Sequence, residues 1–276
     1  MPVNSPMIAV IIIILTSFVK INVDQKIRIQ LLYVKRYTAK VLQMAKNTCI
    51  VTCEHAGNYI PRKFVELFSE EYEIVATHAA YDIGALSMAI IIANILQAPL
   101  LYTKVTRLIV DCNRSMGSDE LFSKFTKNSN SDLKKELIQR YYTKHRHTIE
   151  QAVIKAIQHH TYVVHVAVHS FTPQLNGFKR YCDIGLLYDQ CCPVEQQLCK
   201  SIKETLFALH PLRIAYNYPY RGCGDGVTVW LRKQYGDRYC GIEVEVNQDL
   251  YFQGNHLWRQ LSKNIGQAIK RAMATM

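Results

Sequence analysis

The chain places a carboxylate, an imidazole and an amide close together, directly after an apolar segment. Residues 48–52 are followed by Cys53-Glu54-His55-Ala56-Gly57-Asn58. A buried strand that ends in Glu54 and His55 brings both side chains to the carboxyl edge of a sheet, where open α/β folds bind ligands. These groups are costly to bury unless something binds them. The segment therefore predicts a ligand or metal site; the alternative is a polar turn in which Asn58 caps the next helix.

A second histidine, His169, ends another β-type segment, residues 162–169. Zinc sites that hydrolyse amides use about three nitrogen and oxygen ligands and leave one position for water. We expect His55 and His169 to converge on one divalent ion, with zinc the first choice. We take Glu54 as the third ligand, with orientation of a histidine as its alternative role. His78 and Asp82, four residues apart, are a reserve ligand pair.

Two further carboxylates alternate along the apolar segment 241–246. Glu243 and Glu245 share one face of that predicted strand, and no lysine or arginine lies within it. A carboxylate with an apolar surround has the raised pKa that a general base needs. Glu243 and Glu245 are therefore the candidate catalytic residues.

Two arginines could hold the carboxylate of a substrate, because a planar guanidinium binds that group through two parallel hydrogen bonds. Arg114 follows Asn113 and is the first choice, and Arg221 is the second. The glycine-rich turn 222–226 lacks the lysine and hydroxyl residue of a phosphate-binding loop, which excludes a nucleotide site there.

Strand-like and helix-like segments alternate along the chain. Strands are predicted over 48–53, 100–103, 107–111, 162–169, 212–216 and 239–246, and helices over 61–68, 85–96, 132–159, 194–209 and 255–274. This alternation is typical of one α/β domain. We predict a three-layer sandwich around a twisted, mostly parallel, mixed sheet.

The length, net charge and cysteine content of the chain limit the classes of function that it can have. The 276 residues, 49% of them hydrophobic, suit a globular protein with a sizeable core. A net charge of +11 favours acidic partners such as small carboxylates, but no basic stripe with aromatics or known motif indicates nucleic-acid binding. The nine cysteines include no Cys-x-x-Cys pair, which argues against a disulfide framework and favours a cytoplasmic location.

The first 43 residues are basic and partly apolar. The apolar segment 7–19 is short for a membrane span, which needs about 20 residues, and it lacks the flanking features of a signal peptide. We interpret 1–43 as a dispensable extension and 44–276 as the catalytic domain. Weak membrane association through residues 7–19 is the alternative. A chain that begins at Met44 is expected to fold.

Several segments, taken in order, resemble the N-formylglutamate amidohydrolase family. They are Thr52-Cys-Glu-His-Ala-Gly-Asn58, His78-Ala-Ala-Tyr-Asp-Ile-Gly-Ala85, Val110-Asp-Cys-Asn-Arg114, Val168-His-Ser-Phe-Thr-Pro173, Asp183-Ile-Gly-Leu-Leu-Tyr-Asp189, Asn217-Tyr-Pro-Tyr220 and Gly241-Ile-Glu-Val-Glu-Val-Asn-Gln-Asp-Leu250. The resemblance implies a metal-dependent amide hydrolase with a fold related to the zinc exopeptidases. Its substrate would be an N-acyl amino acid, by default N-formyl-L-glutamate. The resemblance favours Glu245 as the base with Glu243 in support, and Arg114 with Asn113 in the substrate pocket.

The chain also departs from the patterns of these families. Asn58 stands where related exopeptidases have a glutamate ligand, and Asn247 where the family often has arginine. Members of the family carry a histidine in the segment that corresponds to residues 229–234, which here has none. If that histidine stabilises the tetrahedral intermediate, either Arg232 or Lys233 must replace it or the activity is altered. The rival interpretations are a zinc peptidase or amidase for another amide, and a non-catalytic, membrane-attached binding protein with the same fold.

Overall fold

A six-stranded mixed sheet forms the centre of the protein. The computed structural model describes residues 48–160, 162–209 and 211–276. The strand order is β2-β1-β3-β8-β6-β7, and every neighbouring pair is parallel except β6 with β8. The strands are β1 (Thr48–Cys53), β2 (Leu100–Tyr102), β3 (Val163–Phe171), β6 (Ile184–Leu187), β7 (Ile214–Tyr216) and β8 (Tyr239–Asn247). The predicted mostly parallel, mixed sheet is confirmed.

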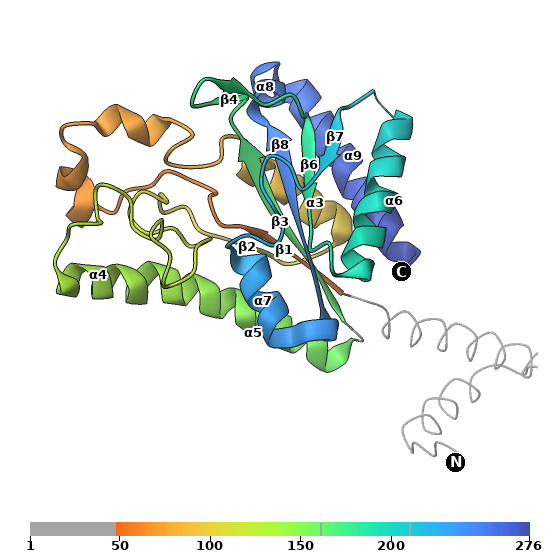
Figure 1. Cartoon of the computed structure of the whole chain (residues 1–276), viewed down its shortest axis with the longest axis horizontal. Helices are drawn as coiled ribbons and strands as arrows, with labels where there is room; N and C mark the ends of the chain where they lie inside the picture. Colours follow the sequence, from red (N-terminus) through yellow and green to blue (C-terminus); the bar gives the residue numbers. More distant parts are fainter. Residues whose placement is uncertain (1–47, 161, 210) are drawn as a thin grey trace, which may run out of the picture. The chain divides into compact units, whose positions relative to one another are not determined.

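Helices cover both faces of the sheet (Figure 1). One face packs against α3 (Ala85–Leu96), α6 (Pro193–Leu209) and α9 (Asn255–Ala274), and the other against α5 (Lys144–His159) and α7 (Val227–Tyr235). The remaining elements are η1 (Arg62–Phe68), η2 (Tyr72–Ala76), α4 (Ser131–Leu137), η3 (Ile138–Thr143), β4 (Gln174–Leu175), β5 (Phe178–Lys179), η4 (Gly236–Arg238) and α8 (Gln248–Phe252). The predicted three-layer α/β architecture is confirmed.

The two faces of β3 and β8 differ in chemistry, because successive side chains of a strand point to opposite faces. The face toward α3, α6 and α9 is aliphatic and includes Val168, Val244 and Val246. The face toward α5 and α7 carries polar side chains, although both strands are buried throughout. His165, His169, Glu243 and Glu245 lie on that polar face.

Some predicted elements were wrong. The predicted strand 107–111 is a series of turns, because backbone groups bond within the segment: Ile109 N donates to Thr106 O (3.1 Å) and Arg114 N to Asp111 O (3.2 Å). The predicted helix 132–159 is continuous but changes to a π-helix over η3. Its cap is Asn130, whose Oδ1 accepts from Leu133 N (2.9 Å). Strand β6 and helix α7 were not predicted.

The remaining expectations concern the cysteines, membrane-spanning helices and the first 43 residues. None of the nine cysteines, all within the described residues, forms a disulfide. Across 48–160, 162–209 and 211–276, no helix is long and apolar enough to cross a membrane. The predicted extension 1–43, with its apolar segment 7–19, lies outside the described residues.

A buried ion pair joins α6, α7 and β8 beneath the site. Glu195 is fully buried and accepts from Arg232 Nε (2.7 Å), Gly241 N (2.8 Å) and Asp189 N (2.8 Å). Arg232 donates in turn to the carbonyls of Gly222 (2.9 Å) and Gly241 (2.7 Å). The pair therefore links two helices, a strand and the glycine-rich turn.

We expect Glu195→Ala to lower the free energy of unfolding by about 3–5 kcal/mol, because it leaves Arg232 and two backbone amides without their acceptor. Urea denaturation measures the change. Lys63→Ala, which removes an exposed ion pair with Glu136, is the control and should cost less than about 1 kcal/mol. Equal effects of the two substitutions would contradict this role for Glu195.

Candidate active site

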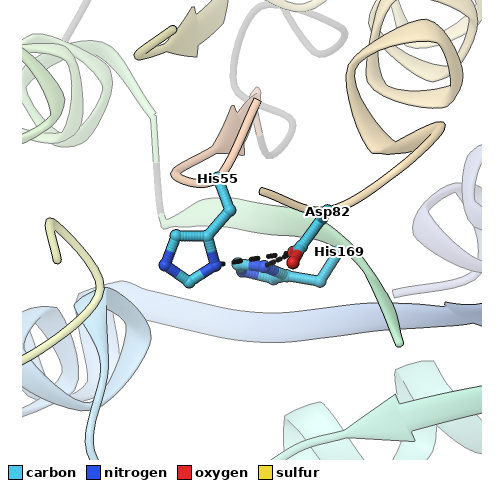
Figure 2. A group of neighbouring side chains, drawn as sticks. All are labelled: His55, Asp82 and His169. Carbon is cyan, nitrogen blue, oxygen red and sulfur yellow. Dashed lines mark hydrogen bonds and ion pairs between the residues drawn. The ribbon is translucent and has the colours of Figure 1, made fainter. Parts of the chain in front are cut away.

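Three side chains from separate segments converge at the carboxyl edge of the sheet. His55 lies in the turn after β1, Asp82 precedes α3, and His169 lies near the end of β3. Their potential ligand atoms lie within 4.8 Å of one another, and all three residues are buried (Figure 2). Asp82 Oδ2 is 2.8 Å from His169 Nδ1 and 3.5 Å from His55 Nδ1. A backbone hydrogen bond from Asp82 N to His55 O (3.0 Å) joins the turn before α3 to the turn after β1.

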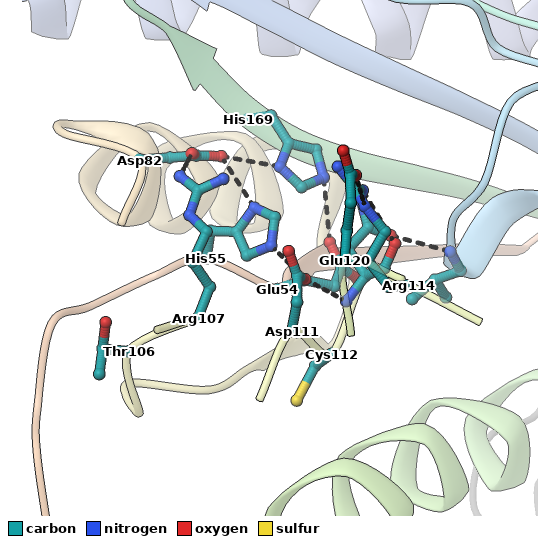
Figure 3. A network of polar contacts seen from close by, with 12 residues as sticks. Glu54, His55, Asp82, Thr106, Arg107, Asp111, Cys112, Arg114, Glu120 and His169 are labelled. Carbon is teal, nitrogen blue, oxygen red and sulfur yellow. Dashed lines mark hydrogen bonds and ion pairs between the residues drawn. The ribbon is translucent and has the colours of Figure 1, made fainter. Parts of the chain in front are cut away.

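The outer nitrogen of each histidine faces a second carboxylate. His55 Nε2 is hydrogen-bonded to Asp111 Oδ1 at 2.7 Å, and His169 Nε2 lies 3.2 Å from Glu54 Oε2 (Figure 3). The second contact is an ion pair without hydrogen-bond alignment, so both Glu54 oxygens are buried without a hydrogen-bond partner. Metal-bound histidines are oriented by carboxylates in this way. The two Nδ1 atoms and Asp82 Oδ2 therefore fit a metal ion with nitrogen and oxygen ligands.

The charges around the group favour protonated imidazoles when no metal is bound. Burial opposes the charged form of His55, but Asp111 and Asp82 outweigh it and raise the pKa of His55. Burial is likewise outweighed at His169, where Asp82 and Glu54 raise the pKa well above its usual value. Metal binding must displace these protons, since only a neutral imidazole binds a metal.

We therefore expect zinc binding at pH 7 to release on the order of one to two protons, and the affinity to rise as the pH rises. Calorimetric titration in buffers with different enthalpies of ionisation measures the number released. Asp111→Asn removes a charge that raises the pKa of His55, so this variant should release fewer protons. Zinc binding without proton release would contradict the assignment of the two imidazoles.

Asp82 occupies the third position of the group, and Glu54 lies on the opposite side of His169. This arrangement favours the reserve candidate Asp82 as the third ligand and the alternative, orienting role for Glu54. His78, the other member of the reserve pair, is exposed and outside the group. Asn58 donates its amide to Val75 O (2.9 Å), which holds a loop.

Glu243 and Glu245 line the same pocket but differ in their contacts. Glu243 accepts a hydrogen bond from Thr228 Oγ1 (2.5 Å), whereas Glu245 Oε2 is buried without a hydrogen-bond partner in the described part of the chain. Burial, aided by Asp82 and Glu243, raises the pKa of Glu245 to about 8. Glu245 therefore has the environment expected of a general base, since its carboxylate is not committed to another group.

The pocket above these groups has a volume of about 290 Å³. Its walls come from the loop after β1, the turns that follow β2, the end of β3, the segment 220–225 and strand β8. The lining residues are His55, Asp82, Arg107, Asn113, Arg114, Glu120, His169, Ser170, Tyr220, Arg221, Gly224, Asp225, Glu243 and Glu245. All the residues predicted for the site, except Glu54 and the reserve candidate His78, line this one pocket.

Gly185 on β6 allows one wall of the pocket to approach the sheet. A Cβ at this position would lie 2.1 Å from Tyr218 O and 3.3 Å from the Glu245 side chain. The peptide bond between Tyr218 and Pro219 is cis. The close approach places the segment that carries Tyr220 and Arg221 beside Glu245.

The sequence model of the N-formylglutamate amidohydrolase family matches residues 47–252, most of the chain. The chain belongs to this family. No curated protein sequence matches it. Family membership makes the chain an amide hydrolase, as the resemblance implied, and the match covers every residue of the pocket.

Two solved structures share the fold of this N-formylglutamate amidohydrolase family member. A gene product of Agrobacterium tumefaciens is 24% identical, with a TM-score of 0.72, over 84% of this chain and 92% of that one. N-formylglutamate amidohydrolase from Ralstonia eutropha is 17% identical, with a TM-score of 0.63, over 83% of this chain and 94% of that one. At these identities the likeness shows the fold alone.

Two of the three predicted substrate-binding residues of this family member are hydrogen-bonded within the protein. Arg114 donates from Nε to Glu120 Oε2 (2.7 Å), and Asn113 Oδ1 accepts from Val227 N (2.8 Å). Arg221 is exposed at the pocket and forms no ion pair with any of residues 48–160, 162–209 and 211–276. Asn113 thus joins the loop to α7, while both arginines keep donors that face the pocket.

The positions at which we expected departures from the family pattern lie outside the pocket lining. Asn247 caps α8 through Asp249 N (3.0 Å) and donates to Cys182 O (3.0 Å). Arg232 is held by Glu195, and Lys233 is exposed outside the lining. Asn247, Arg232 and Lys233 are therefore not among the residues that line the pocket.

Asp111, Arg107 and Tyr220 are among the residues at the site to which the sequence assigned no role. Asp111 lies within a family-like segment, but no role was assigned to it; its position directly before Asn113-Arg114 was the available signal. Arg107 forms a short ion pair with Asp82, and Tyr220 accepts from Arg180 Nη1 (3.2 Å). No sequence pattern singled out Arg107, because it reaches the site only through the fold.

Proposed function

We propose that the protein is a zinc-dependent hydrolase that removes the acyl group of an N-acyl amino acid, with N-formyl-L-glutamate as the default substrate. The observation that carries the proposal is the buried group of His55, Asp82 and His169 beside the uncommitted carboxylate of Glu245. Family membership supports amide hydrolysis, and the pocket adds the residues that this chemistry needs.

In the proposed reaction, Glu245 takes a proton from the attacking water and passes it to the departing amide nitrogen. Water oxygen bonds to the acyl carbon as the C–N bond breaks, which yields a carboxylic acid and an amino acid. A bound zinc ion supplies Lewis acidity for the carbonyl and lowers the pKa of water. Glu243, held by Thr228, maintains the negative surround that keeps the pKa of Glu245 high.

Arg114 and Arg221 are proposed to bind the substrate carboxylates. Arg221 is exposed at the pocket. Arg114 must exchange its ion pair with Glu120, whose side chain is 73% exposed, for one with the substrate carboxylate. An exposed ion pair contributes at most about 1 kcal/mol, so a substrate carboxylate can displace Glu120 at small cost. The pair of arginines suits an amino acid with two carboxylates, such as glutamate.

Two measurements test the proposal. Elemental analysis of protein purified without chelator should find about one zinc ion per chain, in keeping with the one group of ligands in residues 48–160, 162–209 and 211–276. A panel of N-acyl amino acids that varies the acyl group and the side chain should then identify the substrate. We expect N-formyl-L-glutamate to be hydrolysed faster than any other compound of the panel. Preference for a peptide or another amide would instead support the alternative that the protein is a zinc peptidase or amidase.

Full activity without any metal would overturn the mechanism. A metal-free protein that hydrolyses no amide would instead favour the non-catalytic binding protein. A cytoplasmic location is part of the proposal and is tested by cell fractionation of the full chain. Recovery in the membrane fraction, lost when residues 7–19 are removed, would favour the membrane-associated alternative.

A further inference from the structure

One face of the helix that continues from η3 into α5 is buried and carries polar side chains. Its buried residues include Tyr142, His145, Arg146, Ile149 and Val153. They recur three or four residues apart and therefore share one face of the helix. Ile149 and Val153 pack against the sheet, whereas Tyr142 and Arg146 bond to the loop 111–115, which carries Arg114 to the pocket.

Arg146 is only 5% exposed, which is rare for an arginine, because burial of a charge is costly unless polar groups surround it. Its Nε donates to Cys112 O (2.9 Å), and its Nη2 donates to Arg114 O (2.7 Å). The guanidinium carbon lies 5.1 Å from the centre of the Tyr142 ring and 5.0 Å from that of the Trp230 ring. Two carbonyls of one loop and two aromatic faces, which attract a cation, therefore stabilise the buried charge.

The main chain of Arg114 is held more firmly than its side chain. Its carbonyl accepts from Tyr142 Oη (2.8 Å) as well as from Arg146 Nη2. Its guanidinium is paired with Glu120, whose side chain is 73% exposed, and exposed ion pairs contribute little. The position of this guanidinium in the pocket therefore depends on the main chain, which the buried helix face holds.

The part of the loop that contacts the metal group is held separately. Asp111 N donates to Leu121 O (2.9 Å). Asp111 Oδ1 accepts from Asn113 N (2.8 Å) and lies 2.7 Å from His55 Nε2. Arg146 contacts only carbonyls that follow Asp111 in the loop. Loss of Arg146 should therefore displace the substrate-binding arginine with little effect on the metal ligands.

We propose that Arg146 is a positioning residue for the substrate carboxylate. It holds the carbonyls of Cys112 and Arg114 and thereby sets the Arg114 guanidinium in the pocket. This inference rests on the proposed hydrolysis of N-acyl amino acids, in which Arg114 binds a carboxylate. Arg146 is buried and is not among the residues that line the pocket, so it affects substrate binding only through Arg114.

The first test compares Arg146→Met with wild type in the zinc-loaded full chain. Methionine fills space between the two aromatic rings but has no donor, and replacement of a buried charge by an apolar group of similar volume often preserves stability. We expect KM for N-formyl-L-glutamate to rise by roughly tenfold, the effect of weakening one hydrogen bond to a charged group, while kcat and zinc content change little. An unchanged KM, or loss of zinc, would overturn the proposal.

A double-mutant cycle with Arg114→Met identifies the residue through which Arg146 acts. Once Arg114 is replaced, Arg146→Met should raise KM no further, because the effects of residues that act together are not additive. Additive increases in KM would indicate a general effect on the fold and would overturn the proposal. Arg238→Met is the matched control, since Arg238 also donates to two carbonyls, those of Ile157 and His160, but outside the pocket. It should keep the wild-type KM.

Two milder variants test the same role if circular dichroism shows that Arg146→Met does not fold. Arg146→Lys keeps the charge but lacks the planar fork that bonds both carbonyls, so its KM should stay above that of wild type. Tyr142→Phe removes one donor to Arg114 O and should give a smaller increase. A wild-type KM in both variants would overturn the proposal.

Failure of the proposed function gives a different result. If wild type neither hydrolyses any N-acyl amino acid nor binds L-glutamate in a calorimetric titration, both proposals fall together. If it binds L-glutamate without hydrolysing any of these amides, only the proposed function falls, and the dissociation constant of L-glutamate replaces KM in each comparison. If wild type is active and Arg146→Met has the same KM, only the assignment of Arg146 is wrong.

Discussion

Glu245→Gln should lower turnover by roughly 10²–10⁴-fold, the range expected when a positioned general base is removed. The substitution keeps the shape of the side chain but removes its proton acceptor. Zinc content and KM should change little, because Glu245 lies outside the group of His55, Asp82 and His169. Steady-state kinetics and elemental analysis of the same preparation measure the three quantities.

Glu243→Gln is the matched control for this prediction. It alters a neighbouring carboxylate on the same strand face, but one already bonded to Thr228. Its effect on turnover should be smaller by at least about tenfold, because it does not transfer the proton. If Glu243→Gln is the more damaging change, the roles of the two carboxylates are exchanged; if neither matters, both are structural.

Asp82→Ala should abolish stoichiometric zinc binding and with it all activity. The substitution removes a carboxylate whose Oδ2 faces both histidines. A two-ligand remainder is insufficient for a stable zinc site. Zinc content after dialysis, followed by circular dichroism to verify folding, gives the result.

Glu54→Gln distinguishes the two candidates for the third ligand. If Glu54 orients His169 from its outer nitrogen, this variant keeps a full set of ligands and its zinc affinity falls by about 10–100-fold. Complete loss of zinc in Glu54→Gln, with retention in Asp82→Ala, would restore Glu54 as the ligand. His78→Ala is the control for the exposed member of the reserve pair and should leave zinc binding intact.

The sequence predicted the fold well where hydrophobic pattern and end signals agreed. Helices α3 and α9 have the predicted bounds, because long apolar periodicity fixes both the type and the extent of an element. Strand β6 was missed because it contains only four residues and a glycine. Segment 107–111 reads as a strand by composition, but its backbone groups bond within local turns.

The sequence identified most residues of the site, but it did not show which carboxylate contacts which histidine. His55, His169, Glu243 and Glu245 stand in recognisable segments, and all four line the pocket. Which carboxylate faces which imidazole nitrogen depends on the packing of β1 against the turn before α3. Glu54 is adjacent to His55 in sequence, yet its carboxylate contacts His169 on the neighbouring strand.

The alternation of faces along β3 and β8 has a consequence for folding. Slippage of β8 by one residue against β3 would turn Glu243 and Glu245 into the aliphatic layer beneath α3, α6 and α9 and would turn Val244 and Val246 out of it. Such an arrangement would bury unpaired carboxylates among methyl groups, at a cost of several kcal/mol for each. The acids of the site therefore penalise misaligned pairing of the two central strands. Replacing both with leucine would remove this penalty and should allow the chain to populate shifted pairings during refolding.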